Sequence, residues 1–175
     1  IAGSESLTIK GGTTVQATGG NATGENGTGG SGICSNGTLT IRGGEIQQTT
    51  GGNATGTFGN GGSGIFSDGM LSIDSATITN ATGGASTDGY AGDGIHSDGK
   101  LTISGGTIGT AQGGVGNASG GSGILGKTME ILAGTIQKAI GGNSTGTGEN
   151  DTGGDGISAS KFTISGGEIQ QATGG

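Results

Sequence analysis

The stretch from Ile33 to Thr55 reads ICSNGTLTIRGGEIQQTTGGNAT, and close variants of it fill the whole chain. It returns almost intact at the C-terminus, where Phe162 to Gly175 reads FTISGGEIQQATGG. We take the first residue of its Leu-Thr-Ile triplet, and the equivalent residue of each other copy, as an anchor. The six anchors are Leu7, Leu39, Leu71, Leu101, Met129 and Phe162. Their spacing of 28 to 33 residues is typical of solenoids and other repeat arrays.

Large apolar residues stand at fixed distances from every anchor. The second residue after the anchor is Ile in all six copies, and the seventh is Ile in five copies and Thr14 in the first. A further Ile lies five or six residues before each anchor, and a Gly-Gly pair begins twelve residues after it. Together with the anchors, these positions hold 23 of the 33 Val, Ile, Leu, Met, Phe, Tyr and Cys residues. A disordered chain has no reason to keep this register, so the pattern outweighs the disorder that 49 glycines would suggest.

Within one copy the apolar period is two. Leu39 and Ile41 flank Thr40, so the apolar pair points to one side of a strand and Thr40 to the other. The runs are short and β-branched, and turn pairs such as Asn36-Gly37 separate them. Each copy thus holds three short strands and a Gly-rich loop, in which the spacing from the Gly-Gly pair to the next Ile varies from 10 to 15 residues.

Short strands, fixed corners and one side of variable length predict an all-β fold, a parallel β-helix or β-solenoid. Its coils would stack about 4.8 Å apart around columns of Ile and Leu. Burial of each such side chain contributes roughly 1.5–3 kcal/mol. We predict a single solenoid domain over residues 1–175, with about six coils at residues 1–32, 33–64, 65–94, 95–123, 124–156 and 157–175.

Two stretches carry a resemblance to a known family. AGDGIHSDGKLTISGGTI (Ala91 to Ile108) and GGDGISASKFTISGGEI (Gly153 to Ile169) resemble repeats of the carbohydrate-binding β-helix proteins of microbial surfaces, relatives of the pectate-lyase-like right-handed β-helices. The resemblance covers essentially the whole chain and implies a right-handed coil. It also implies that the acidic residue of Gly-Asp-Gly-Ile, here Asp93 and Asp155, binds calcium at the coil edge. The other copies carry serine at this position: Ser31, Ser63 and Ser122.

The asparagines depart from what loop composition alone predicts. Eight of the nine stand in Asn-x-Ser/Thr, although Ser and Thr make up 43 of 175 residues and chance would place about two there. The eight are Asn21, Asn26, Asn36, Asn53, Asn80, Asn117, Asn143 and Asn150. Asn60 is the exception.

One turn position separates two interpretations of these asparagines. Asn36-Gly37 is followed by Thr38, whereas the equivalent turns contain Asp68 and Asp98 and have no Thr at that distance. Asn and Asp serve such turns about equally well. One interpretation is selection for N-glycosylation of a secreted protein, and the other is the ordinary composition of Thr-rich loops. Asn80 is the weakest candidate, because it aligns with residues expected in strands.

Composition argues against several classes of function. Six basic against 13 acidic residues give a net charge of −7, so we expect no nucleic-acid partner. No apolar run approaches the roughly 20 residues of a membrane span. His96 is the only histidine and is expected to be an isolated surface residue, and neither a nucleophile motif nor a cluster of paired carboxylates is recognisable. We therefore expect no enzyme. Cys34 is the single cysteine, which rules out an internal disulfide.

Two functions remain open. The first is a structural extracellular or cell-surface protein, an N-glycosylated β-helix that forms or belongs to a filament or surface fibre. The chain starts and stops on repeat boundaries without polar caps, so we expect end-to-end stacking of copies or a longer array, and a mature chain or an excerpt. The alternative is a surface adhesin that binds polysaccharide, with calcium at Asp93 and Asp155 as its only candidate cofactor.

Overall fold

The computed structural model describes residues 1–149 and 151–175. Every regular element in these residues is a β-strand. In chain order the strands are β1 (Ala2–Gly3), β2 (Ser6–Ile9), β3 (Thr13–Thr18), β4 (Ile33–Ser35), β5 (Thr38–Arg42), β6 (Glu45–Thr50), β7 (Ile65–Ser67), β8 (Leu71–Asp74), β9 (Ala76–Thr82), β10 (Ile95–Gln112), β11 (Ile124–Ile140), β12 (Ile157–Ile164), β13 (Glu168–Ile169) and β14 (Ala172–Thr173). The all-β prediction is confirmed.

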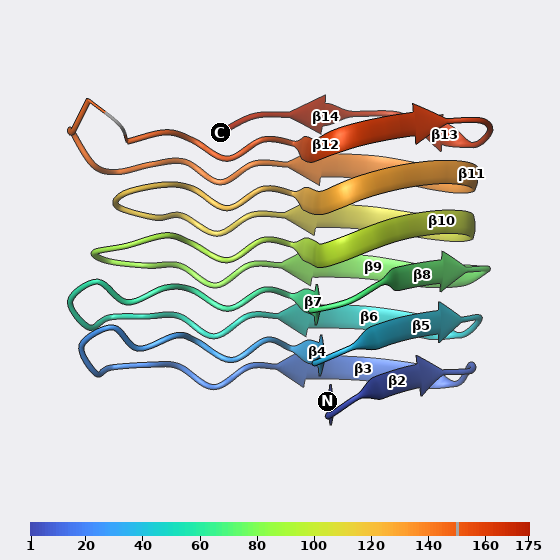
Figure 1. Cartoon of the computed structure of the whole chain (residues 1–175), viewed down its shortest axis with the longest axis horizontal. Coiled ribbons are helices and arrows are strands. Elements are labelled where there is room, and N and C mark those ends of the chain that lie inside the picture. Colours follow the sequence, from blue (N-terminus) through green and yellow to red (C-terminus); the bar gives the residue numbers. More distant parts are fainter. Residues whose placement is uncertain (150) are drawn as a thin grey trace.

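Equivalent strands of successive coils pair in parallel and in register. Leu7 pairs with Leu39, Leu39 with Leu71, and Leu71 with Leu101, so the anchors form one column along the stack. As the stack rises from the N-terminus, the chain runs to the right in front and returns behind, which makes the coil right-handed (Figure 1). This is the usual hand of parallel crossovers. The predicted right-handed parallel β-solenoid is confirmed, with about five turns.

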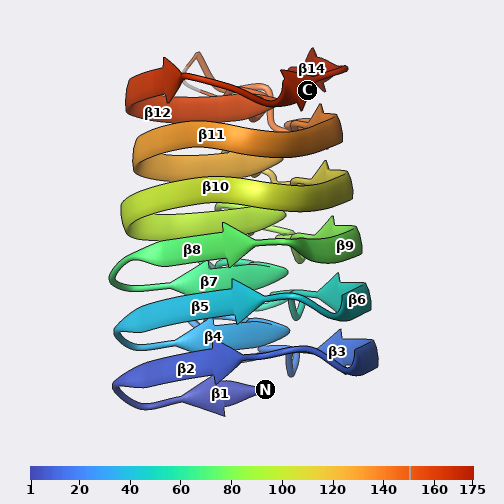
Figure 2. The ribbon, with the colours of Figure 1, turned by 90° about the vertical axis from the view of Figure 1, so that its right-hand side faces the viewer.

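The expectation of three strands in every coil is wrong for the fourth and fifth coils. There β10 and β11 each continue around both corners as one strand of 18 and 17 residues (Figure 2). Their pairing shifts register between Ser97 and Lys100 and again between Ile103 and Thr107. Such bulges bend a strand without ending its ladder, which is why the strands remain unbroken at these corners.

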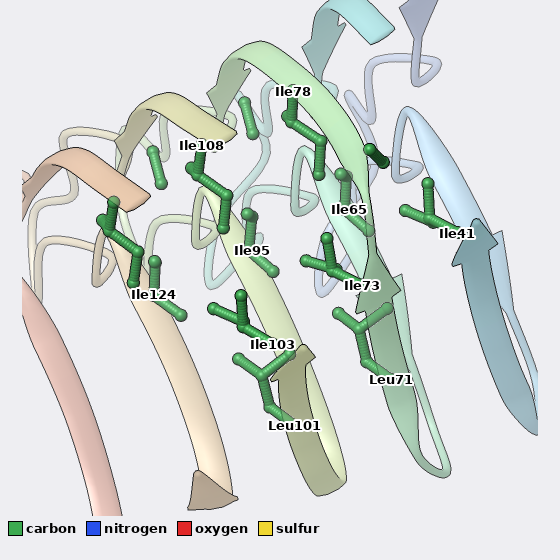
Figure 3. Close-up of a cluster of buried hydrophobic side chains, with 14 of the residues drawn as sticks. Ile41, Ile65, Leu71, Ile73, Ile78, Ile95, Leu101, Ile103, Ile108 and Ile124 are labelled. Atoms are coloured by element: carbon green, nitrogen blue, oxygen red, sulfur yellow. The ribbon is translucent and has the colours of Figure 1, made fainter. Parts of the chain in front are cut away.

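The interior of the stack consists of apolar columns. In the second coil, Ile33, Leu39 and Ile41 are fully buried, and Ile46 is 2% exposed. Figure 3 shows the same columns continuing through the neighbouring coils, where their side chains point toward one another. Alternation along each strand puts these residues inside and leaves the intervening polar residues outside.

The corners use small residues for two different reasons. Gly43 and Gly44 have φ of 71° and 78°, a left-handed conformation that glycine adopts without strain. At the other corner the buried Ser67 donates a hydrogen bond of 2.8 Å to the Gly37 carbonyl of the coil below. The equivalent Ser97 donates to Gly69, and this bonding explains why hydroxyls are tolerated in the interior.

The Gly-rich loops form an ordered second structure beside the strands. They stack at residues 19–32, 51–64, 83–94, 113–123, 141–149 and 151–156, and we call this stack the loop wing (Figure 1). Each loop has an outgoing and a returning limb, and backbone hydrogen bonds join the limbs of one loop and of successive loops. The loops are therefore part of the rigid scaffold.

Glycines line the contact between the two limbs. A zigzag of ten backbone hydrogen bonds of 2.7 to 3.0 Å runs from limb to limb along the stack. We call the residues joined by these bonds the glycine seam: Gly20, Gly30, Gly52, Gly62, Gly84, Gly92, Gly114, Gly121, Gly142, Gly154 and Gly175. A Cβ atom on Gly51 would lie 1.8 Å from the Gly62 carbonyl oxygen, so the two limbs of the second loop approach too closely for any side chain. A Cβ atom on Gly62 would lie 2.2 Å from the Gly30 carbonyl oxygen of the loop below, so successive loops pack equally closely.

Candidate glycan-bearing asparagines and loop-tip pocket

The seven asparagines of the Asn-x-Ser/Thr motifs that the structure describes lie on the outside of the stack. Asn117 is half-buried, and Asn150 lies outside the described residues. The others are exposed: Asn21, Asn26, Asn36, Asn53, Asn80 and Asn143. Asn80 lies within β9, paired with Gln48 of β6 and Thr110 of β10, which confirms its expected strand position.

Asn21 and Asn53 also hold successive loops together. The side-chain oxygen of Asn21 accepts a hydrogen bond of 2.8 Å from the Asn53 backbone N–H, and that of Asn53 accepts one of 2.8 Å from Ala85. These bonds use only the oxygen. The amide nitrogen, the atom that N-glycosylation modifies, takes no part in them. The same side chains can therefore support the loop wing and bear a glycan.

Asn26 and Asn36 occupy turns. Asn26 has φ of 54°, in the left-handed region that asparagine tolerates better than most residues. Asn36 lies at the corner between β4 and β5, where its backbone N–H donates to the Gly3 carbonyl at 3.0 Å. The left-handed conformation of Asn26 is therefore a local reason for asparagine besides glycosylation, whereas any residue except proline would make the backbone bond of Asn36.

The structure does not bring Asp93 and Asp155 together. They occupy equivalent positions two coils apart with Ser122 between them, a separation of about 10 Å at the usual strand spacing. Asp93 is 8% exposed and already accepts hydrogen bonds from the Ser122 backbone N–H at 2.6 Å and from the His96 ring at 2.8 Å. Asp155 is exposed. In the part of the chain that is described, no three His, Cys, Asp or Glu side chains gather as a metal site.

His96 is the centre of a polar cluster, and the expectation of an isolated histidine is wrong. Its Nδ1 lies 2.8 Å from Asp93 Oδ2 and its Nε2 lies 3.0 Å from Asp98 Oδ1. The ring also packs edge-on against Phe66, with centroids 5.3 Å apart. Only the imidazolium donates from both ring nitrogens. Since a carboxylate holds each nitrogen, neither is left to take a proton from a nearby serine, and the arrangement does not suit a Ser–His–Asp mechanism.

The protonated state of His96 is favoured in the folded protein. Burial acts to lower the pKa of the imidazole, but the hydrogen bonds and charges of Asp93 and Asp98 outweigh it and raise that pKa above its ordinary value. A group whose pKa is higher in the folded than in the unfolded state stabilises the folded protein. For His96, this stabilisation is fully present below the unfolded-state pKa of about 6.5 and is lost as the pH rises through the folded-state pKa.

We therefore expect the free energy of unfolding to fall as the pH rises from about 6.5 through the raised pKa of His96. Urea unfolding at a series of pH values measures this slope. The His96→Gln variant removes the only histidine and should flatten the curve in that window. A wild-type stability that is constant or rises across the window would show that the two carboxylates do not hold the imidazolium.

A pocket of about 380 Å3 lies at the tips of the second, third and fourth loops. Its lining includes two aromatic residues, Phe58 and Tyr90, which are 64% and 63% exposed. Asp88 Oδ2 accepts a hydrogen bond of 3.1 Å from the Phe58 backbone N–H. Asn60 Oδ1 accepts a hydrogen bond of 3.1 Å from the Tyr90 backbone N–H. Asn117 completes the polar rim. This site, the loop-tip pocket, combines two exposed rings with amide and carboxylate groups.

The sequence pattern did not single out Phe58 and Tyr90, although a signal was present. The chain has only three Phe and one Tyr. Phe66 and Phe162 belong to strands, whereas Phe58 and Tyr90 fall in successive Gly-rich loops among small polar residues. An aromatic side chain in such a loop does not belong to the apolar columns of the interior. Its position outside the core indicates a candidate binding surface.

The described residues include no helix long and apolar enough to cross a membrane. Comparisons with protein-family models, with curated proteins and with solved structures find no match to this chain.

Proposed function

We propose that the protein is a structural component of an extracellular or cell-surface fibre, a rigid shaft that carries N-linked glycans. The observation behind this proposal is that six asparagines of the Asn-x-Ser/Thr motifs are exposed on a stack whose strands and loops are both hydrogen-bonded from coil to coil. A scaffold of this kind holds its surface groups at fixed spacing. Its polar exterior and its columns of buried Ile and Leu suit a load-bearing element.

The glycans would keep neighbouring shafts apart. A parallel β-solenoid offers long polar faces that pack readily against a second copy, and bulky hydrated groups prevent this. They would also shield the loop tips from proteases, which cut preferentially at exposed loops.

The two end coils are the surfaces through which shafts would join. Phe162 and Ile164 occupy interior columns but are 43% and 51% exposed, because no coil covers them in the single chain. Their unpaired backbone groups are a template for another parallel strand. A further coil, from a longer chain or a second copy, would bury these residues, so the proposed partner is the same kind of coil.

The test is to secrete the protein from a cell that performs N-glycosylation. We expect a mass above the 16.2 kDa of the polypeptide, which returns to that value after enzymatic removal of N-glycans. Light scattering of the two forms should show more lateral association after the glycans are removed. A secreted protein with the bare polypeptide mass would contradict the glycoprotein proposal.

A second candidate function is a carbohydrate-binding surface adhesin, related to the β-helix proteins that the repeat sequence resembles. The loop-tip pocket favours it, because exposed rings with polar neighbours suit the apolar face and hydroxyls of a sugar. Calcium at Asp93 and Asp155 would be the cofactor of this candidate, and at Asp93 it would have to replace the hydrogen bonds from His96 and Ser122. It predicts retention on immobilised polysaccharide and a melting temperature that chelator lowers, whereas the structural proposal predicts neither.

A further inference from the structure

We propose that the loop-tip pocket is the seat of the protein's own glycan, attached at Asn117, whose first sugar rings pack on Phe58 and Tyr90. This inference rests on the proposed N-glycosylation and assigns one of its sites a distinct role. The Asn117 glycan would be an ordered part of the loop wing, while the glycans at the exposed motifs project into solvent.

The position of Asn117 sets it apart from the other motif asparagines. It is half-buried and lines the pocket, whereas Asn53 and Asn143 are exposed and lie outside the lining. Its loop is tied to the coil below, because the Ala118 backbone N–H donates to the Gly89 carbonyl at 3.1 Å. A sugar on the Asn117 side chain therefore begins at the wall of the pocket.

The chemistry of the pocket fits a neutral sugar. One face of a pyranose ring presents C–H groups, which pack on the electron-rich faces of aromatic rings such as Phe58 and Tyr90. Asn60 uses only its side-chain oxygen within the protein, so its amide N–H groups can donate to a sugar, and the Asp88 carboxylate can accept hydrogen bonds from hydroxyls. Among the residues that the structure describes, the lining holds one carboxylate and neither Lys nor Arg, which disfavours acidic ligands.

Covalent attachment of the glycan to Asn117 makes its contact with the pocket favourable even if the pocket binds free sugar weakly. A tethered sugar faces an effective concentration on the order of millimolar or more, so it binds without the cost of association from solution. It also covers two rings that are otherwise about two-thirds exposed to water. The consequence is that a glycosylated Asn117 excludes a sugar from outside, and the adhesin candidate would apply only to chains without this glycan.

Tyr90 gives a selective readout, because it is the only tyrosine and the chain has no tryptophan. The test compares three secreted proteins: wild type, Asn117→Gln and the matched control Asn143→Gln. Iodide quenching of tyrosine fluorescence measures access to Tyr90, and glycopeptide mass analysis establishes occupancy. We expect low quenching for wild type and for Asn143→Gln, and several-fold stronger quenching for Asn117→Gln.

A further arm distinguishes the source of the sugar. Soluble chitobiose should change the tyrosine fluorescence of Asn117→Gln but not that of the wild-type glycoprotein. The inference is overturned if Asn117 carries a glycan and wild type is quenched as strongly as Asn117→Gln, or if Asn117 is unmodified while other motifs are occupied. Those results leave the proposed function intact. A protein without glycans at any asparagine would instead overturn both.

Discussion

Gly62→Ala is expected to lower the free energy of unfolding by about 3 kcal/mol or more, a large effect for the addition of one methyl group. The new Cβ atom would lie 2.2 Å from the Gly30 carbonyl oxygen and 2.4 Å from that of Gly29. Both atoms are backbone, so no side chain can rotate away. The second loop would have to move away from the first, and the hydrogen bonds of the glycine seam on either side of Gly62 would break.

Gly24→Ala is the matched control. Gly24 lies in the first loop, but no heavy atom comes within 4 Å of the position its Cβ would take. Its substitution should change stability by less than about 0.5 kcal/mol. Urea unfolding of the two variants measures the difference. Equal stabilities would mean that successive loops are not packed on one another, and the loop wing would then be no part of the scaffold.

Leu101→Ala should cost about 2–5 kcal/mol, because the substitution leaves a cavity in the middle of a column. Leu101 is fully buried in β10, between Leu71 of the coil below and Met129 of the coil above. The coils on both sides are held in register by their ladders, so the neighbours have little freedom to close the gap.

Leu132→Ala is the matched control, because it removes the same side-chain atoms at a position on the outside of the coil. Leu132 lies in β11 and is 42% exposed, so its loss should cost well under 1 kcal/mol. Thermal unfolding followed by circular dichroism compares the two. If Leu132→Ala destabilised the protein as much as Leu101→Ala does, the inside and outside of the coil would be misassigned.

The shaft could be predicted from the sequence because its columns repeat. Leu39 and Ile41 reveal a strand by their alternation, and their return at a fixed spacing in every coil indicates parallel stacking. Six copies of the same four positions supply more information than any single strand could. Fold, register and most of the interior follow from that repetition.

The loop wing could not be predicted in the same way. Glycine has no side chain to alternate, so the sequence does not show whether Gly52 and Gly62 lie in a flexible loop or in a packed seam. The difference depends on backbone hydrogen bonds between limbs, such as that from Gly62 to Gly52 at 2.9 Å. The same limit explains the unbroken β10 and β11, since pairing around a corner leaves no mark on residue type.

The two candidate sites differ in how far apart in sequence their residues lie. The His96 cluster is local, because Asp93 lies three residues before the histidine and Asp98 two residues after it in the same strand, whereas the loop-tip pocket depends on contacts between neighbouring coils. Phe58, Tyr90 and Asn117 come from three successive loops of unequal length, and stacking brings them into one pocket. Periodicity predicts which residues share a column, but it does not predict how loop tips of different length meet.

Glycans on the motif asparagines are the property that most directly distinguishes the proposed structural glycoprotein from a bare β-solenoid. Enzymatic deglycosylation of the secreted protein in 18O-labelled water converts each occupied asparagine to labelled aspartate, and peptide mass analysis then identifies the sites. We predict label at exposed motif asparagines such as Asn21, Asn36 and Asn53, and none at Asn60, which shares the loops but lacks the motif. Unlabelled asparagines throughout the chain would contradict the account.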